Sequence, residues 1–223
     1  KMSKSLGNVV DPIDLANSFG VDALRYFFLR EVSFGQDGSY SAEAIVTRVN
    51  AELANSYGNL AQRTLSFIFK NLDGELPTQG EETPDDLALL GLVKQTCANE
   101  VPREFSAFAF SQGIEAWMRA VFACNQYIDA QAPWALRKTD PIRMAVVLRT
   151  LVKAIRDLTL AIQPIIPASA GKMLDQLGHS EGGRDYAALT DADWYNRLTG
   201  GGFRLSAPTP LFPRLDLPTD DAA

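Results

Sequence analysis

A long helical pattern of apolar residues, from Ser41 to about residue 178, most limits what this chain can fold into. Apolar side chains recur every three or four residues there, which gathers them on one face of a helix. Prolines and glycines interrupt the pattern repeatedly, so several helices must fold back on one another. The sequence therefore predicts a mainly α fold, an antiparallel helix bundle with short loops.

Capping residues and prolines predict the helix boundaries. Ser41 is a predicted N-cap, and Thr83 with Asp86 forms a variant capping box. Pro102 is expected to interrupt the helix that follows, and Trp134 is expected in a short turn after a later helix. The predicted helices cover about residues 41–71, 85–100, 106–131, 141–162 and 168–177.

Four segments are expected along the chain: residues 1–7, 8–40, 41–178 and 179–223. The second is expected to be a short mixed α/β connector, with one helix after Asp11-Pro12 and another from Val21 to Glu31. The third is the helix bundle. The fourth is a polar loop and a proline-rich tail, which is expected to pack back on the core through Phe203, Leu205, Leu211, Phe212 and Leu215, with residues 219–223 disordered.

Charge argues against a non-specific nucleic-acid binder. The formal net charge is −6 and the isoelectric point is about 4.9, whereas such binders neutralise phosphates with a basic surface. Recognition of a few exposed bases by stacking and hydrogen bonds remains compatible with this charge. Positive charge is locally concentrated between Arg137 and Asp157.

The cysteine and histidine content bounds the chemistry. Cys97, Cys124 and His179 are too few for a zinc knuckle or a disulfide framework, so no metal site is expected. Both thiols are expected to be small buried groups in a reducing cytoplasmic setting. No apolar run reaches the ~18 residues needed to span a bilayer, so no membrane contact is expected.

A polar stripe is predicted on the first long helix, where Asn55, Asn59 and Arg63 follow one another at intervals of four residues. Two carboxamides offer donors and acceptors to a base edge, and the guanidinium can stack on a base or bind a phosphate. The alternative is an ordinary solvated helix face.

Trp134 follows Pro133 at a break between helices, where an indole is harder to bury than within a helix. It is a candidate platform for stacking a base. The alternative is a side chain that fills the gap between two helices. Trp117 is expected in the core, and Trp194 could serve either way.

At the N-terminus, the side chains of Lys1, Ser3, Lys4 and Ser5 suit a polyphosphate, because ammonium groups and hydroxyls bind phosphate oxygens. The alternative is a frayed, solvated terminus. The string Lys1-Met2-Ser3-Lys4-Ser5 resembles the second signature of class I aminoacyl-tRNA synthetases, the loop that closes over ATP during amino-acid activation.

Further motifs narrow this resemblance to bacterial methionyl-tRNA synthetases. They occur in the family's order and spacing, and the similarity extends from residue 1 to about residue 217. The motifs are Gly20 to Phe27, Phe34 to Gly38, Asn50 to Leu53, Asn59 to Arg63, and Gln131 to Trp134.

The resemblance implies a role for each candidate residue. Lys4 and Lys1 would be catalytic, and with Ser3 and Ser5 they would contact ATP, which is used with magnesium. In the bundle, the resemblance implies a CAU anticodon site in which Asn55 and Asn59 hydrogen-bond bases, Arg63 binds a base or the backbone, Trp134 stacks on the first anticodon base and Pro133 orients it.

The family's nucleotide-binding domain, methionine pocket and any zinc-bearing insert would lie upstream of residue 1. The chain is therefore expected to be a C-terminal portion of a methionine–tRNA ligase, inactive and without bound cofactor by itself. Its expected partners are tRNA(Met) and, through the absent domain, ATP and methionine. A monomer is expected, since no dimerising module follows the tail. A stand-alone helical tRNA-binding or scaffolding module and a plain structural domain are the alternatives.

Overall fold

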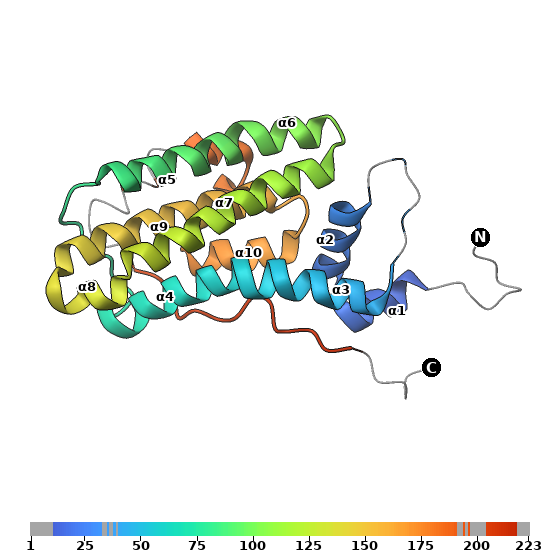
Figure 1. Cartoon of the computed structure of the whole chain (residues 1–223), viewed down its shortest axis with the longest axis horizontal. Coiled ribbons are helices and arrows are strands. Elements are labelled where there is room, and N and C mark those ends of the chain that lie inside the picture. Colours follow the sequence, from blue (N-terminus) through green and yellow to red (C-terminus); the bar gives the residue numbers. More distant parts are fainter. Residues whose placement is uncertain are drawn as a thin grey trace, which may run out of the picture.

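The computed structural model of the chain describes residues 11–32, 35, 38, 40–190, 194, 196 and 204–217. Helices dominate this part of the chain and pack side by side as a bundle (Figure 1). Among these residues, extended backbone pairs only at one isolated antiparallel bridge, between Glu75 and Arg204. The predicted mainly α bundle is confirmed.

The described part of the connector is helical. Helix α1 (Pro12–Phe19) begins at Asp11, whose Oδ1 accepts a bond from the Ile13 amide at 2.7 Å. Gly20, with φ of +85°, separates it from α2 (Val21–Glu31). A mixed α/β connector was expected, but residues 11–32 contain helices and no strand. Phe34, Gln36 and Asp37 lie outside the described residues.

The first long helix is continuous but not uniform. Ser41 caps α3 (Ala42–Arg48) through a 3.1 Å bond from the Ala44 amide, as predicted. A π-helical segment, η2 (Val49–Gly58), then leads without a break into α4 (Asn59–Leu72). A π-helix has more residues per turn than an α-helix, so a spacing of four keeps apolar residues on one side. The apolar residues at helical spacing along this segment face the core: Phe67 is half-buried, and the others are fully buried, namely Ile45, Val49, Leu53, Tyr57 and Leu60.

Pro102 does not interrupt the next helix, contrary to expectation. Helix α5 (Pro84–Gln95) continues through the π-helical η3 (Thr96–Glu100) into α6 (Val101–Ser106), which contains the proline. The wide turn just before it displaces the carbonyl that the proline ring would meet in a regular helix. The chain reverses at Phe108, which has φ of +58°, so the following helix begins later than predicted.

The remaining helices complete the bundle. Helix α7 (Phe110–Gln131) ends at Ala132, and α8 (Pro133–Thr139) follows directly. Trp134 therefore lies in a short helix and not in the expected turn, because proline at the first helical position starts a new helix readily. Then come α9 (Pro141–Ile162), α10 (Pro167–Gln176) and the short 3₁₀ turns Glu181–Gly183 and Tyr186–Thr190.

Helix α9 is the central element, since every residue from Met144 to Ile162 is buried (Figure 1). Its cations are used within the fold. Arg149 donates to the carbonyls of Gln79 and Gly80 at 2.8 and 2.9 Å, which fixes the loop before α5. Lys153 pairs with Glu82 of the same loop at 2.6 Å. Most of the cations between residues 137 and 157 thus bond to other groups of the fold.

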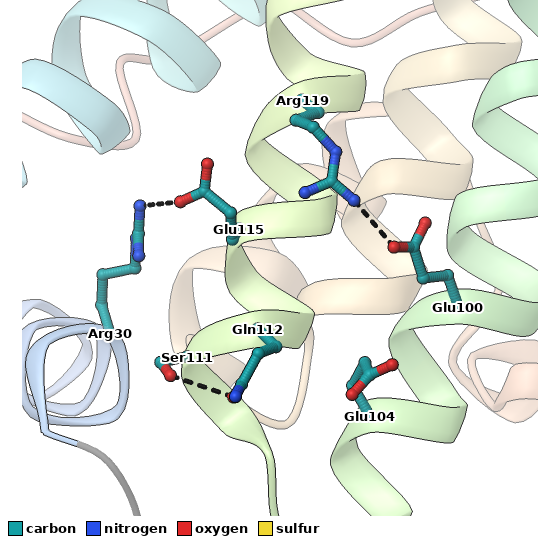
Figure 2. Close-up of a pocket in the computed structure, with 7 residues that line it drawn as sticks. All are labelled: Arg30, Glu100, Glu104, Ser111, Gln112, Glu115 and Arg119. Carbon is teal, nitrogen blue, oxygen red and sulfur yellow. Dashed lines mark hydrogen bonds and ion pairs between the residues drawn. The ribbon is translucent and has the colours of Figure 1, made fainter.

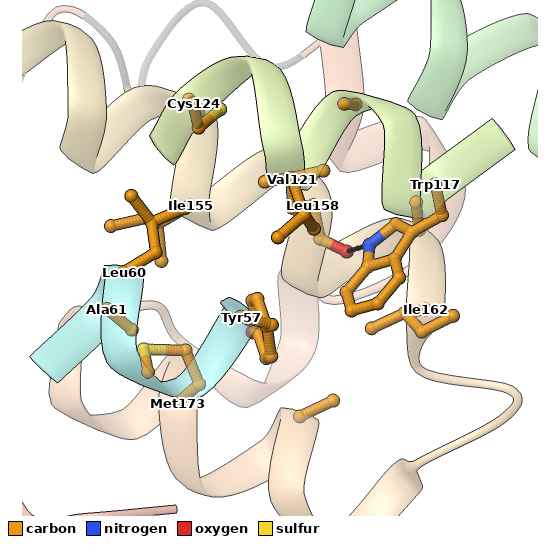
Figure 3. Close-up of a cluster of buried hydrophobic side chains, with 14 of the residues drawn as sticks. Tyr57, Leu60, Ala61, Trp117, Val121, Cys124, Ile155, Leu158, Ile162 and Met173 are labelled. Atoms are coloured by element: carbon orange, nitrogen blue, oxygen red, sulfur yellow. Dashed lines mark hydrogen bonds between the residues drawn. The ribbon is translucent and has the colours of Figure 1, made fainter. Parts of the chain in front are cut away.

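The core joins η2, α4, α7, α9 and α10 (Figure 3). Trp117 is fully buried, as predicted, and its indole donates to the Leu158 carbonyl at 2.9 Å. Cys97 and Cys124 are buried free thiols, again as predicted. Trp194, ambiguous from sequence, is buried, with the Arg156 guanidinium 4.9 Å from its ring centroid.

The C-terminal segment 204–217, called the strap here, crosses the bundle as extended chain (Figure 1). Two side-chain carboxamides hold its backbone. Asn50 exchanges two bonds with Leu215, at 2.9 and 2.8 Å. Gln176 exchanges two bonds with Thr209, at 3.1 and 2.9 Å. The strap is therefore fixed at two points on the helices.

Candidate nucleic-acid interface

The predicted polar stripe spans the junction of η2 and α4. Asn55 lies in the π-helical segment, and Asn59 is the first residue of α4. The Asn59 amide donates to the carbonyl of Ala54, five residues back, which shows that the wide turn extends to this point. Both asparagine side chains are exposed and Arg63 is half-buried. The carboxamides are therefore available to an external partner.

Trp134 is presented by an unusual turn. Ala132 takes the left-handed conformation, with φ of +41°, and ends α7. Buried Pro133 then starts α8 and anchors its first turn. The Trp134 side chain is 46% exposed, so it does not fill a gap between helices. An exposed indole on a fixed backbone offers an apolar face to a partner.

Arg63 and Trp134 lie together although they are far apart in the sequence. The Arg63 guanidinium carbon is 5.1 Å from the centroid of the Trp134 ring. Its Nη2 also donates to Asp129 Oδ1 of α7 at 2.7 Å. Such cation–π contacts contribute about 0.5–1 kcal/mol at exposed sites, enough to favour one relative placement. Asn55, Asn59, Arg63 and Trp134 together are called the Asn–Arg–Trp face below.

A buried carboxylate braces the turn that presents Trp134. Asp86, at the start of α5, accepts bonds from Tyr127 of α7 and from Arg143 of α9, the latter at 2.7 Å from Nη2. Arg143 also donates to Gln131, the last residue of α7, at 2.8 Å. Burial raises the pKa of Asp86, but the bonds from Arg143 and Tyr127 outweigh it and lower that pKa to about 2. The sequence indicated Asp86 only as a capping residue.

Exposed cations flank Trp134 on the side of α8. Arg137 and Lys138 lie in its last turn, and Arg137 donates to the Asn71 side chain at the end of α4. Lys70 is also exposed, in the last turn of α4. Arg137 and Lys138 thus put positive charge on the same short helix as the indole, in a chain whose net charge is −6.

A pocket of about 350 Å³ lies beside the two asparagines. Asn55, Gly58, Asn59 and Gln62 form its helical side, with Ala54. Residues 210–212 of the strap form the opposite side. Sequence reasoning missed this pocket, because the strap and the helix are some 150 residues apart in the chain.

A second, strongly charged pocket lies between α2, α6 and α7, and Figure 2 shows its lining. Its two arginines are each paired with a glutamate. Arg119 donates to Glu100 at 2.7 Å, and Arg30 donates to Glu115. The pocket thus has no unpaired arginine with which to bind an anion, and its lining carries one more glutamate than arginine.

The residues predicted to contact ATP, Lys1, Ser3, Lys4 and Ser5, lie outside the described residues. Among the residues that the structure describes, no three His, Cys, Asp or Glu side chains gather into a metal site. No helix in this part of the chain is both long enough and apolar enough to cross a membrane.

Comparison with known proteins first gives the class of protein. A family model described as "tRNA synthetases class I (M)" matches residues 1–65, and one described as "Anticodon binding domain of methionyl tRNA ligase" matches residues 76–221. The first match contains Asn55, Asn59 and Arg63, and the second contains Trp134. The chain belongs to the methionyl-tRNA ligase family.

Individual relatives agree with this assignment. The methionine–tRNA ligase of Rhizobium meliloti is 47% identical over 218 residues, which is 98% of this chain and 41% of the relative. That of Mycobacterium tuberculosis is also 47% identical, over 98% of this chain and 41% of the relative. The chain therefore spans about two fifths of the length of the curated relatives that it matches.

Solved structures of the M. tuberculosis methionyl-tRNA synthetase have the same fold. The apo form aligns with a TM-score of 0.87 and 46% identity over 94% of this chain and 42% of that one. The complex with methionyl-adenylate aligns with a TM-score of 0.88 and 47% identity over 96% and 42%.

Proposed function

We propose that this chain is the anticodon-reading part of a methionine–tRNA ligase and that it binds the CAU anticodon of tRNA(Met) through the Asn–Arg–Trp face. One observation carries the proposal: an exposed tryptophan on a fixed turn lies against an arginine, beside two exposed asparagines. Unpaired bases of an RNA loop are read by this combination of an aromatic platform with side chains that bind base edges.

Each member of the face has a proposed role. The exposed indole of Trp134 stacks on the first anticodon base, and Pro133 sets its orientation. The carboxamides of Asn55 and Asn59 each offer a donor and an acceptor to base edges. Arg63 binds a base or the backbone and keeps its place through Asp129. The exposed cations of α4 and α8 supply the phosphate contacts that position the loop.

In the complete ligase, methionine is activated before its transfer. The methionine carboxylate attacks the α-phosphate of magnesium-bound ATP, methionyl-adenylate forms, and pyrophosphate leaves. Lys4 and Lys1, with Ser3 and Ser5, stabilise negative charge that builds up on the leaving phosphates. The terminal ribose hydroxyl of the tRNA then attacks the adenylate carbonyl and releases AMP. Aminoacylated tRNA serves translation, so the proposed place of action is the cytoplasm.

Binding to RNA hairpins tests the anticodon role. The purified chain is titrated with a fluorescent hairpin that carries a CAU loop, and with hairpins in which each of the three bases is replaced in turn. We expect the CAU hairpin to bind at least about fivefold more tightly than every replacement, since a lost base contact costs about 1–3 kcal/mol. Equal affinity for all loops would indicate a non-selective tRNA-binding or scaffolding module, and absence of binding would indicate a plain structural domain.

A further inference from the structure

We propose that the strap supplies the second wall of a pocket that accepts one unpaired base of the RNA loop, a base other than the one stacked on Trp134. This proposal rests on the proposed function, because the RNA loop that would fill the pocket is the anticodon loop bound by the Asn–Arg–Trp face. It assigns a binding role to residues 210–212, a segment of the chain remote from that face in sequence.

The lining of the pocket suits a nucleobase. Exposed Asn55 and Asn59 lie on one side with Gln62, and Pro210, Leu211 and Phe212 lie on the other. A base has two flat apolar faces and a polar edge, so an apolar wall opposite carboxamides matches it. The volume, about 350 Å³, is at the small end of the range for ligand pockets and fits a single planar group.

The wall is held in place before any ligand arrives. Gln176 binds the backbone of Thr209 on one side of residues 210–212, and Asn50 binds the backbone of Leu215 on the other. Both carboxamides are buried, so they act on the strap and not on a ligand. Fixing a binding surface beforehand reduces the entropy lost on binding.

The close approach of helix and strap depends on a glycine. A Cβ atom added at Gly58 would lie 3.3 Å from the Phe212 ring of the strap, and it would also crowd the Leu53 carbonyl oxygen of its own helical segment, at 2.8 Å. The Phe212 ring packs against Tyr57, with their centroids 6.2 Å apart. The inner end of the pocket is therefore closed by packed side chains, while Asn55, Asn59 and Pro210 are exposed at its mouth.

The pocket continues the Asn–Arg–Trp face. Asn59 lines the pocket, Arg63 follows one turn later on α4, and its guanidinium reaches Trp134. Anticodon bases splayed out of their stack could thus meet Trp134 on one side of Arg63 and the pocket on the other. A side chain of a bound peptide would not need the pocket to adjoin the Asn–Arg–Trp face. The arrangement therefore favours an RNA base as the occupant.

Filling the pocket tests the proposal. Ala54→Phe places a ring in the pocket without removing a polar group, and Ala51→Phe adds the same ring to an exposed position of η2 outside it. We expect Ala54→Phe to weaken binding of the CAU hairpin at least tenfold and Ala51→Phe to leave it within twofold. Circular dichroism and thermal melting show whether each variant is folded. Leu211→Ala removes part of the wall without crowding, and we expect it to weaken binding three- to tenfold.

Hairpins that each lack one loop base identify the occupant. For one of these abasic hairpins, binding to the parent chain should be weaker than that of the intact hairpin. Ala54→Phe should bind this abasic hairpin and the intact hairpin with the same affinity, because the missing base has no place in the filled pocket. If folded Ala54→Phe and Leu211→Ala bind like the parent, or if all abasic losses persist in Ala54→Phe, the pocket proposal is wrong while the anticodon role stands. If the parent chain shows no preference for CAU, both proposals are wrong.

Discussion

Trp134 is the residue on which the proposed function can be tested most directly. Trp134→Ala removes an exposed indole, so we expect the fold to persist and binding of a CAU hairpin to weaken by about 1–3 kcal/mol, the usual contribution of one stacked base. Titration with a labelled hairpin measures the change. Phe108→Ala is the control, because Phe108 is a similarly exposed aromatic between α6 and α7. Equal losses in the two variants would contradict base stacking at Trp134.

Asp86 makes stability depend on pH in a defined direction. Its carboxyl has a pKa of about 2 in the folded chain against an ordinary value of 3.8, so the folded state binds the proton more weakly. The stabilisation, about 2 kcal/mol, is complete above about pH 5 and is lost as pH falls toward 2. We expect Asp86→Asn to be less stable at pH 7 and to lose less stability on acidification.

Urea unfolding at pH 7, 5 and 3 measures this effect. Asp85→Asn, at the exposed neighbouring position, controls for the loss of a charge near the start of α5. If both variants lost stability in parallel with the parent as pH falls, the bonds to Arg143 and Tyr127 would not set the pKa of Asp86 as described.

Single residues show how much of the site could be read from sequence. The side chains of asparagine, arginine and tryptophan can bind or stack on bases in any fold. The candidate residues could therefore be predicted from the sequence, namely Asn55, Asn59, Arg63, and Trp134 after Pro133. The partners of Asp86 were not visible, because Tyr127 and Arg143 lie 41 and 57 residues away along the chain. Only packing of three helices brings them together, and no local pattern records it.

Among the elements, the junction between the connector and the bundle depends on Glu52. This buried carboxylate in η2 accepts bonds from Tyr26 of α2 at 2.6 Å and from Arg48 of α3 at 2.8 Å, and Arg30 of α2 lies 3.3 Å away. Burial raises the pKa of the Tyr26 hydroxyl, and the charge of Glu52 raises it further. The group therefore couples α2 to the bundle through one negative charge.

Removing that charge should loosen the connector. We expect Glu52→Gln to lower the free energy of unfolding by about 2–3 kcal/mol, because Arg30 and Arg48 lose a charged partner in a partly buried place. Relative to the parent chain, Glu52→Gln should speed amide hydrogen exchange more in α2 than in α9. Glu81→Gln, at an exposed loop position, should have little effect. Uniform destabilisation of all helices would argue against a local coupling role.

Helix boundaries also show why some predictions were wrong. N-caps at Asp11 and Ser41 were predicted correctly, because a side chain next to free amides is a local signal. The π-helical segments were missed, since no residue type favours them and tertiary packing selects them. That is also why Pro102 was misjudged: its effect depends on the turn before it.

At the scale of the whole molecule, the chain is about 41% of the length of its relatives. We expect the isolated 223-residue chain to bind a CAU hairpin but not to catalyse ATP–pyrophosphate exchange, because the activation chemistry proposed for the complete ligase needs more of the protein. Radiolabelled pyrophosphate exchange measures this, with a full-length relative as the positive control. Exchange by the purified chain above background would contradict the expectation.

The two buried thiols, Cys97 and Cys124, can be used to measure how often the core opens to solvent. Burial raises the pKa of Cys124 to about 12 and raises that of Cys97 as well, so almost no thiolate is present near neutral pH while the core is closed. Only the thiolate attacks disulfide reagents, and it forms readily once water reaches the sulfur. The labelling rate of an unmodified chain therefore reports how often water reaches the core around α7 and η3, and a hairpin that binds the folded chain should slow labelling by stabilising the closed core.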